Sequence, residues 1–435
     1  MQTGRRSLEK ANQFFQDTIT RRHRPDYQIV LYMGLLMLLG LIVMFAIGPQ
    51  RANVLNIANG TDFYTGSYFF IKQSASVFLA LVAFVVMAMA PFELLKKHAK
   101  TILIIGLAAC ALLAIAGWTG MGIAMCSHGA CRWFNLGVFG TLQPAELLKF
   151  GVLLFTAGFL GMRMKQGLIN DRDKTVIPLL AVLAVASLFV IIIQKDMGTG
   201  IAMFAIIASM LVVSGMSKKV GLMLAIGALV AGLLFIVTAP HRIERVQTFL
   251  TGDSSMTTGD ADANYHINHA KIAIGSGGFM GVGIGNSVQA TGYLPEAIND
   301  SVFAILGEIF GFVGLVIILL LFSALLLRLL NISDHLASPW MKLVAAGIFG
   351  WLAAHVILNV AAMIGVFPLT GVTLPLLSFG GTSMIFIAGA LGLAFQLSRY
   401  TAHGSINKEM NYEDISSRRG VGRTRYAGRR SPSRT

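Results

Sequence analysis

The sequence predicts an all-α integral membrane protein with about ten transmembrane helices. Hydrophobic residues make up 55% of the 435 residues, and charged residues only 12%, against roughly 25% in an ordinary soluble domain. The hydrophobic residues also gather in runs of about 20, the length that crosses a bilayer as a helix. The expected spans lie near residues 27–48, 67–91, 101–118, 141–162, 176–194, 200–216, 219–238, 302–327, 341–364 and 383–398.

A single membrane domain, residues 27–398, is expected between two polar arms. Residues 1–26 form a basic arm, and because they are polar and charged we expect no cleavable signal peptide there. Residues 399–435 are rich in arginine and predict a disordered basic tail. Both arms are expected to contact anionic lipid or a cytoplasmic partner, and nucleic-acid binding is not expected.

The distribution of lysine and arginine predicts the orientation in the membrane. By the positive-inside rule, loops rich in these residues face the cytoplasm, which places both termini there. The longest loop, residues 239–302 between helices seven and eight, then faces outward and holds more acidic than basic residues. The basic residues of the inner loops are Lys96, Lys97, Lys100, Arg163, Lys165, Arg172, Lys174, Lys218, Lys219, Arg328 and Lys342.

Cysteine and histidine give weak signals. Cys126 and Cys131 fall in an expected outward loop, where they either form a disulfide or remain two free thiols. His266 and His269 are three residues apart and could contact one metal from a helix, but two histidines alone do not predict a metal site.

Two places combine charge with apolar surroundings, where ionisable residues usually face a cavity or a partner. Glu146 and Lys149 are three apart, so on a helix they share a face and can pair. The pair is either a structural clasp or one wall of a polar cavity. Asp196 stands where a span ends on the outer side, either as an ordinary interfacial acid or as part of a site.

The glycine-rich stretch at residues 275–287 has no preceding strand, so a nucleotide-binding loop is not expected. Gly277 and Gly278 either allow backbone N–H groups to approach an anion or form a tight turn packed on the bundle. A second loop rich in proline, glycine and serine, residues 367–384, includes Ser378 and precedes the last span.

The stretch "LPEAINDSVFAILGE" places three carboxylates at the start of a long apolar run. Asn299 or Asp300 is expected to be the N-cap of the helix that follows, so capping is the simplest role of Asp300, and a role in a site is the alternative. Glu308 lies about two turns further along the same helix, where it makes a second polar contact or tunes Asp300.

Four stretches, in this order, resemble the SEDS family of FtsW/RodA-type bacterial glycosyltransferases: "QPAELLKF", "QKDMGTG", "IAIGSGGFMGVGIGNSVQATGYLPEAINDSVFAILGE" and "NVAAMIGVFPLTGVTLPLLSFGGTS". The resemblance implies ten transmembrane helices in the bacterial cytoplasmic membrane. It also implies polymerisation of lipid II, the undecaprenyl-pyrophosphate-linked disaccharide, into peptidoglycan strands outside that membrane. A class B penicillin-binding protein, with other divisome or elongasome proteins, is the implied partner.

The resemblance also implies residue roles. Asp300 matches the family's essential carboxylate, and we expect it to act as general base on the acceptor sugar hydroxyl. Glu296 matches the glutamate of the same motif. Glu146, Lys149 and Asp196 match residues that line the family's central cavity.

The leaving pyrophosphate needs positive charge, so cations near the outer surface are expected to bind it. A divalent cation (Mg²⁺ or Mn²⁺) held by the acids is the alternative, and no dedicated metal ligands are expected. The candidate groups for the pyrophosphate are Arg132, Arg242, Arg245, Lys149, Lys195 and the N–H groups of Gly277 and Gly278.

The sequence departs from the family pattern around the essential acid, where Ile298, Asn299 and Ser301 replace the usual residues. Two other functions stay open: a lipid II flippase, or an inactive scaffold for the penicillin-binding partner. Leu369 and Thr370 favour an elongation-type member, whereas the long charged arms favour a division-type member, towards which we lean slightly.

Overall fold

The computed structural model describes residues 23–127, 130–137, 140–224, 227 and 258–401. Within these residues, eight helical segments are long and apolar enough to cross a membrane, and α7 (Met197–Val213) is a shorter apolar helix. The predicted class, an all-α membrane protein, is confirmed. The predicted span at 219–238 falls mostly outside the described residues, as do Arg242, Arg245, residues 1–22 and residues 402–435.

The apolar runs of the sequence become helices, with shifts at their ends. One further helix, Thr258–Ser276, lies within the predicted loop at 239–302 and was not predicted. The run that begins near residue 141 becomes a helix only from Pro144, because proline fits the first turn of a helix and not its interior. The helical segments are α2 (Tyr27–Asn59), α3 (Tyr68–Met89), α4 (Phe92–Trp118), α5 (Pro144–Lys165), η2–α6–η3 (Arg172–Val176, Ile177–Ser187, Leu188–Ile193), α7 (Met197–Val213), α10 (Thr258–Ser276), α11 (Val302–His335), α12 (Pro339–Met363) and α13 (Gly381–Leu397).

A small antiparallel sheet lies between α4 and α5 and was not predicted. Its strands are β1 (Ala124–Ser127), β2 (Ala130–Asn135) and β3 (Thr141–Leu142), in that order. Cys126 and Cys131 face each other across β1 and β2 and form a disulfide, which settles the alternative that the sequence left open.

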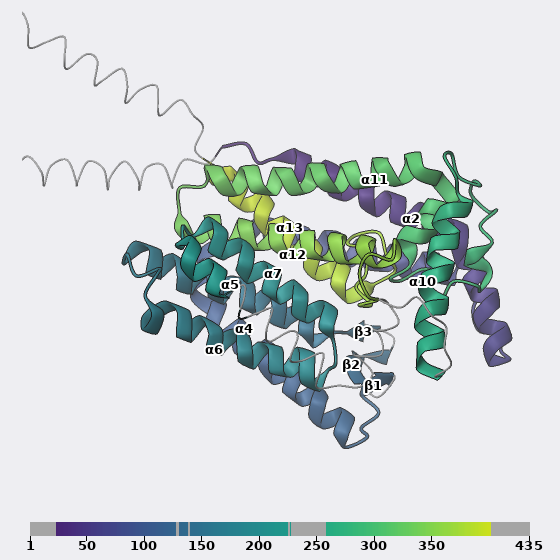
Figure 1. Ribbon diagram of the computed structural model, residues 1–435, viewed down its shortest axis with the longest axis horizontal. Helices are drawn as coiled ribbons and strands as arrows, with labels where there is room; N and C mark the ends of the chain where they lie inside the picture. The colour runs from purple at the N-terminus through teal and green to yellow at the C-terminus, as the bar shows by residue number, and fades with distance from the viewer. Residues whose placement is uncertain (1–22, 128–129, 138–139, 225–226, 228–257, 402–435) are drawn as a thin grey trace, which may run out of the picture.

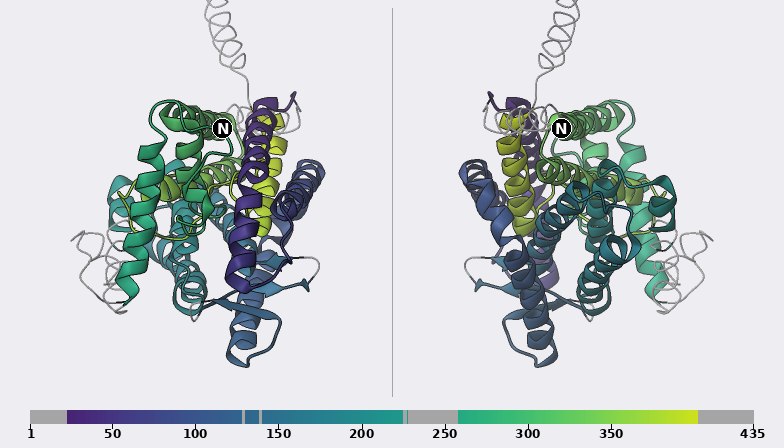
Figure 2. Two further views of the ribbon diagram at one scale, coloured as in Figure 1. Left: turned by 90° about the vertical axis from the view of Figure 1, so that its right-hand side faces the viewer. Right: turned by 90° about the vertical axis from the view of Figure 1, so that its left-hand side faces the viewer.

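Most of the helices run lengthwise through the molecule, with α10 standing across them, so the bundle has two distinct ends (Figure 1). The described ends of the chain meet at one of them, where His23 N donates to Arg399 O at 2.8 Å. The sheet and α10 lie towards the opposite end (Figure 1). The end-on views show α2 beside α13, so the first and last described helices are neighbours (Figure 2).

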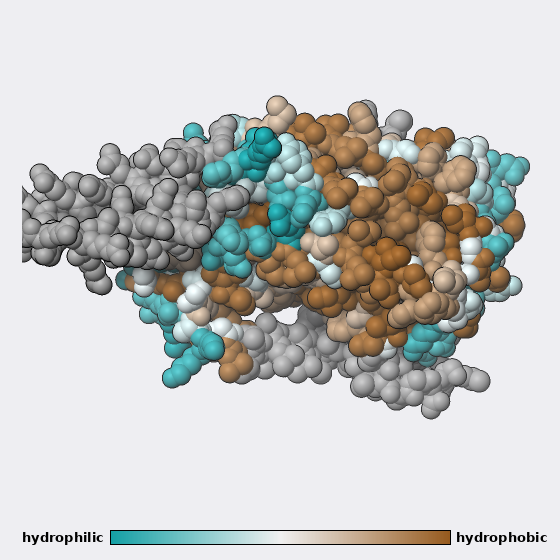
Figure 3. Space-filling model, turned by 90° about the horizontal axis from the view of Figure 1, so that it is seen from above, coloured by the Kyte–Doolittle hydropathy of each residue, from teal (hydrophilic) through white to brown (hydrophobic). Residues whose placement is uncertain are grey.

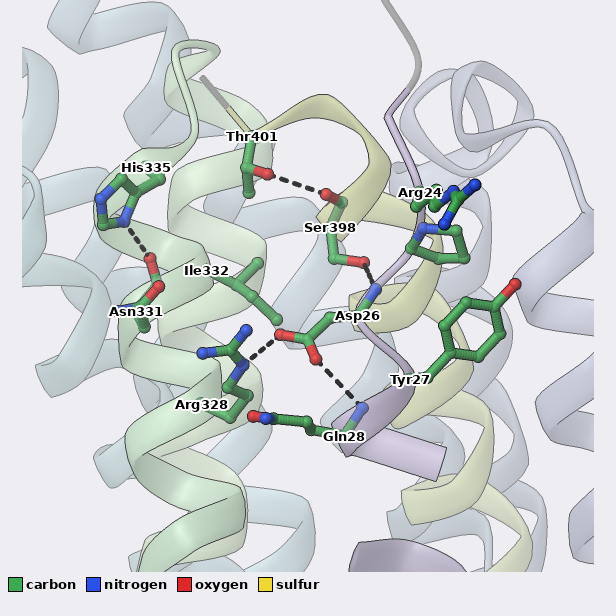
Figure 4. Close-up of a pocket in the computed structure, with 11 residues that line it drawn as sticks. Arg24, Asp26, Tyr27, Gln28, Arg328, Asn331, Ile332, His335, Ser398 and Thr401 are labelled. Atoms are coloured by element: carbon green, nitrogen blue, oxygen red, sulfur yellow. Dashed lines mark hydrogen bonds and ion pairs between the residues drawn. The ribbon is translucent and has the colours of Figure 1, made fainter. Parts of the chain in front are cut away.

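One polar clasp joins α2, α11 and α13 at the end that carries the termini (Figure 4). The Asp26 carboxylate accepts from Arg328 Nε and, at 3.1 Å, from Gln28 N, while Asp26 N donates to Ser398 Oγ at 2.9 Å. The surrounding residues line an open pocket of about 340 Å³. Since Asp26 offsets the charge of Arg328 inside this pocket, the cluster is explained as a structural tie.

The outer faces of the bundle are apolar, as a membrane environment requires. Apolar side chains cover a broad band of the face in Figure 3, and hydrophilic side chains gather beside that band and towards the far end. Along α11, Phe312, Ile317, Leu320 and Leu327 are each more than half exposed. Such a surface would be unusual on a soluble monomer and is expected against lipid.

Helices α4 and α5 pack with their backbones nearly in contact. A Cβ added to Gly151 would come within 2.7 Å of the Cα of Leu103, and one added to Gly106 within 2.9 Å of the Cα of Leu148. Small residues at such a crossing allow close van der Waals packing. In a bilayer this packing matters because the hydrophobic effect does not drive helices together. Gly158, two turns further along α5, has open space at its Cβ position.

Gly151→Ala is therefore expected to destabilise the bundle, because the added methyl group meets rigid backbone on α4. Overpacking of this kind costs about 1–3 kcal/mol. Gly158→Ala on the same helix is the matched control and should be neutral or slightly stabilising, because alanine is the better helix former. Thermal unfolding of the detergent-solubilised protein measures both, and equal effects would contradict the packing argument.

Candidate active site

Asp300 lies in a tight turn that enters α11. The turn is closed by its own backbone, since Asn299 N and Ser301 N both donate to Glu296 O, at 2.9 and 3.2 Å. Glu296 adopts the left-handed region with φ of 50°, an unusual conformation for a non-glycine residue. The N-cap position of α11 belongs to Ser301, so Asp300 stands one residue before the cap and its expected capping role does not hold.

A buried asparagine on α12 fixes this turn in the bundle. Asn359 Nδ2 donates to Asp300 O at 2.6 Å and to Val372 O at 2.7 Å, so one amide group joins the turn to the loop before α13. The same loop contacts the turn again, where Phe379 N donates to Ile298 O at 2.8 Å. Gly371 leaves the carboxylate room, since a Cβ there would lie 4.0 Å from Asp300 Oδ2.

Asn359 was missed as a site residue, although it begins one of the stretches that carry the family resemblance. Its signal was available, because a side-chain amide inside an apolar run must find partners within the protein. Asn359 lies 20 residues after Pro339, where α12 begins beside the chain termini. At 1.5 Å per residue, Asp300 is therefore about 30 Å along the bundle from that end.

The environment of Asp300 makes its carboxyl group unusually basic. Burial, followed by the negative charge of Glu296, raises the pKa of Asp300 from 3.8 to about 7. Asn299 Nδ2 donates to the Glu296 carboxylate, which holds that charge in place. A carboxyl group with a pKa near neutrality can accept a proton from a hydroxyl far better than an exposed aspartate can.

Glu146 and Lys149 form the ion pair that their spacing predicted. The two charged atoms are 2.8 Å apart, and both side chains are buried. Lys149 Nζ also lies 3.1 Å from His355 Nε2 and 5.0 Å from the centre of the Trp351 ring, so α5 is joined to α12. His355 is one helical turn before Asn359, so this polar cluster and the Asp300 clamp share one face of α12.

Asp196 caps α7 instead of standing free. Its carboxylate accepts from Thr199 N at 2.9 Å, from Thr199 Oγ1 at 2.8 Å and from Gln143 Nε2 at 3.1 Å. Arg132, on β2, donates to Gln194 O at 3.2 Å and to Lys195 O at 2.8 Å, so it holds the turn that leads to Asp196. The side chain of Lys195 is exposed beside them.

The predicted glycine loop packs on α11. A Cβ on Gly277 would lie 2.0 Å from Gly307 O, and Gly278 accepts from Phe312 N at 2.9 Å. Both glycine N–H groups donate to carbonyl groups of α10. Their role in substrate binding stays a prediction, and the observed contacts support the alternative of a tight packed turn.

Glu308 and Ser378 also hold loops in place. The Glu308 carboxylate accepts from Ser287 Oγ at 2.5 Å and from Val288 N at 3.0 Å, just before the short helix η4 (Gln289–Thr291). This is the second polar contact that the sequence suggested. Ser378 Oγ accepts from Leu374 N at 2.8 Å, and a substrate contact for Ser378 stays a prediction.

The two histidines of α10 contact different partners. His266 Nε2 lies 2.5 Å from Ser301 Oγ, and His269 Nδ1 lies 2.8 Å from Gln289 Oε1. In the part of the chain that the structure describes, no three histidine, cysteine or carboxylate side chains come together as metal ligands.

These features define a multi-pass membrane protein with an acidic site at the end of the bundle opposite the termini. The family model described as "Cell cycle protein" (FtsW, RodA and SpoVE) matches residues 27–403, so the chain belongs to this family. Stage V sporulation protein E of Bacillus subtilis is 30% identical, over 88% of this chain and 100% of that protein. A "Probable peptidoglycan glycosyltransferase FtsW" of Nitrosomonas europaea is 31% identical, over 86% of this chain and 93% of that protein.

Solved structures show the same fold. A chain from "Structural coordination of polymerization and crosslinking by a peptidoglycan synthase complex" aligns with a TM-score of 0.64 at 24% identity, over 86% of this chain and 98% of that one. The rod shape determining protein RodA of Thermus thermophilus aligns with a TM-score of 0.59 at 21% identity, over 87% and 98% of the two chains.

The buried pair predicts a mutational signature. Lys149→Met leaves the Glu146 carboxylate buried without its cation, and Glu146→Gln removes the matching anion, so either change should destabilise on the order of 3 kcal/mol. The double variant should be more stable than Lys149→Met alone, because no unpaired charge remains. Unfolding of the three purified variants in detergent tests this, and a double variant no better than that single one would contradict it.

The raised pKa of Asp300 predicts a pH-dependent cost in stability. The folded protein holds this proton more tightly than the unfolded chain does, so the residue makes unfolding easier as pH rises from 3.8 to about 7. Asp300→Asn cannot ionise, and its gain in melting temperature over the parent should grow across that interval and level off above it. A gain that is independent of pH would show that Asp300 has an ordinary pKa.

Proposed function

We propose that this chain is a peptidoglycan glycosyltransferase that polymerises lipid II, with Asp300 as the general base. The observation that carries the proposal is the half-buried Asp300 carboxyl, with its pKa raised to about 7, in a turn clamped by Asn359. Membership of the family and the name of the FtsW relatives support the reaction class.

In this reaction Asp300 removes the proton from the acceptor sugar hydroxyl as its oxygen attacks the anomeric carbon of the donor. The bond from that carbon to the pyrophosphate breaks, and undecaprenyl pyrophosphate leaves with the bonding electrons. Direct displacement inverts the α-linked donor to a β-linked product. The base needs a pKa near the working pH, which burial and Glu296 supply.

The leaving pyrophosphate requires cations, and the exposed Lys195 is the described side chain that best suits this role. The guanidinium of Arg132 already holds the Gln194–Lys195 turn, so it would support Lys195 more than bind substrate. A divalent cation held by the acids stays a prediction. Within the described residues, no third carboxylate, histidine or cysteine joins Asp300 and Glu296 as a ligand.

The positions of the chain ends and of Asp300 support an orientation in the membrane. The described chain ends lie together at one end of the bundle, while Asp300 lies towards the other. This arrangement suits cytoplasmic termini and an active site at the outer face of the bacterial cytoplasmic membrane. A class B penicillin-binding protein would use the product strand there, and the FtsW relatives favour a division-type role.

The flippase alternative relied on a polar cavity walled by Glu146 and Lys149. The two side chains instead contact each other, and Lys149 also contacts His355, which suits a clasp between helices. If Glu146→Gln/Lys149→Met folds but does not polymerise lipid II, the pair serves the reaction as well as the fold.

Asp300→Asn is expected to abolish polymer formation from lipid II by the purified protein, assayed with and without a class B penicillin-binding partner. The amide cannot accept the proton, while its shape keeps the turn intact. Glu93→Gln, an exposed carboxylate on α4, is the matched control and should retain full activity. Normal polymerisation by Asp300→Asn would refute the assignment of the base, and headgroup transfer across vesicles without polymer would favour the flippase.

The rate should also rise with pH through about 7 in the parent protein, because only the ionised carboxylate accepts a proton. Glu296→Gln removes the neighbouring negative charge, which lowers the pKa of Asp300 and should move this rise to lower pH. A rise that stays in place would show that Glu296 does not act on the base.

A further inference from the structure

The residue after Asp300 makes a contact that the reaction described so far does not use. Ser301 is fully buried, and its hydroxyl lies 2.5 Å from His266 Nε2, 2.9 Å from Pro295 O and 3.5 Å from Asp300 Oδ1. His266 comes from α10, which is distant in sequence, and is 9% exposed. The side chain of Ser301, next to Asp300, is therefore held by α10, in addition to the contacts that α12 and the loop before α13 make with this turn.

Counting hydrogens decides the direction of these bonds. A serine hydroxyl has one hydrogen to donate. The carbonyl oxygen of Pro295 is an acceptor, and so is Asp300 Oδ1 when the carboxyl is ionised. If His266 carried its proton on Nδ1, its bare Nε2 would compete for that single hydrogen. With the proton on Nε2, His266 donates to Ser301, and the hydroxyl remains free to donate towards Pro295 or Asp300.

We propose that His266 is a positioning residue for the base: through Ser301 it holds the turn that carries Asp300 and directs the serine hydroxyl towards that turn. This inference rests on the proposed function of Asp300. Together with Asn359, it means that two helices clamp the base from either side, α12 through the carbonyl of residue 300 and α10 through the side chain of residue 301.

The charges around His266 are consistent with a neutral donor. Burial lowers the pKa of His266, and the nearby charge of Glu296 opposes this effect. Asp300 is reached from His266 through the Ser301 hydroxyl. A neutral imidazole matters here, because a cation beside Asp300 would favour the ionised carboxylate and make it a weaker base.

The arrangement differs from the serine–histidine–aspartate triad of hydrolases. In that triad the carboxylate contacts the histidine and the serine is open to substrate. Here the carboxylate lies beside the serine, and Ser301 is fully buried. The three residues therefore suit the positioning of a carboxylate base, with Ser301 as a link and not a nucleophile.

Four variants of the full-length protein test this, with lipid II polymerisation measured against substrate concentration and pH. His266→Leu should lower kcat about tenfold, the usual scale for a lost buried hydrogen bond, with KM within about twofold. His266→Gln keeps an N–H donor and should recover most of the rate. Ser301→Ala should lower kcat similarly and move the rise of rate to higher pH, since the hydroxyl normally favours the ionised carboxylate. His266→Leu/Ser301→Ala should be no slower than the slower single variant, because both act through one link.

His269→Leu is the matched control, because His269 is on the same helix but its observed contacts are with Gln289, Tyr265 and Tyr293, outside the 296–301 turn. Its kcat and pH profile should match the parent. The proposal is overturned if His266→Leu keeps the parental kcat, if His266→Gln is as slow as His266→Leu, or if the double variant shows the product of the two single losses. Asp300→Asn separates the two levels of the argument: activity in that variant refutes the base itself, whereas an inactive Asp300→Asn with a normal His266→Leu refutes only the positioning role.

Discussion

The geometry of the site depends on one side-chain amide. Asn359 Nδ2 donates its two hydrogens to the carbonyl oxygens of Asp300 and Val372, which belong to loops more than seventy residues apart in sequence. Neither loop has a helical hydrogen-bond pattern to satisfy its backbone there, and in a bundle surrounded by lipid such groups must be satisfied within the protein. One donor group thus removes two unpaired acceptors and sets where the carboxylate of Asp300 stands. The amide oxygen of Asn359 has no partner among the described residues, so the observed hydrogen bonds of this side chain are the two that its Nδ2 donates.

The same helix face explains why the polar groups cluster as they do. On α12, Trp351, His355 and Asn359 follow one another at a spacing of four residues and so line one side of the helix. The first two contact Lys149, and the third holds the active-site turn. Charged and polar side chains are expensive inside a membrane bundle, and placing them in one column lets them satisfy one another. The Glu146–Lys149 pair then fixes α5 against the helix that positions Asp300, which connects a stability element to the site without placing it in the chemistry.

Much of this could be read from the sequence, and the rest could not for identifiable reasons. The apolar runs predicted the spanning helices, because span length is set by the bilayer and needs no tertiary information. The spacing of Glu146 and Lys149 predicted their pairing, because it is local to one helix. Asn359 and the contact between His266 and Ser301 escaped, because each joins segments that only the fold brings together. The pattern of the glycines at 277 and 278 allowed either an anion site or a packed turn. Their contacts with α11, which only the fold shows, support the packed turn, and a role in substrate binding stays a prediction.

The turn around Asp300 accepts costs that a purely structural turn would avoid. Glu296 adopts a left-handed backbone conformation and places a second negative charge near a carboxyl that is already poorly solvated. Each feature works against folding, yet each raises the basicity of Asp300 or fixes its direction. Strain and like charges persist only where the surrounding structure over-determines them. Three contacts hold this turn. Asn359 donates to the carbonyl of Asp300, Phe379 N donates to the carbonyl two residues earlier, and the side chain of Ser301 contacts His266. A carboxylate with a raised pKa that is held from three directions suits the proposed general base better than it suits a helix cap.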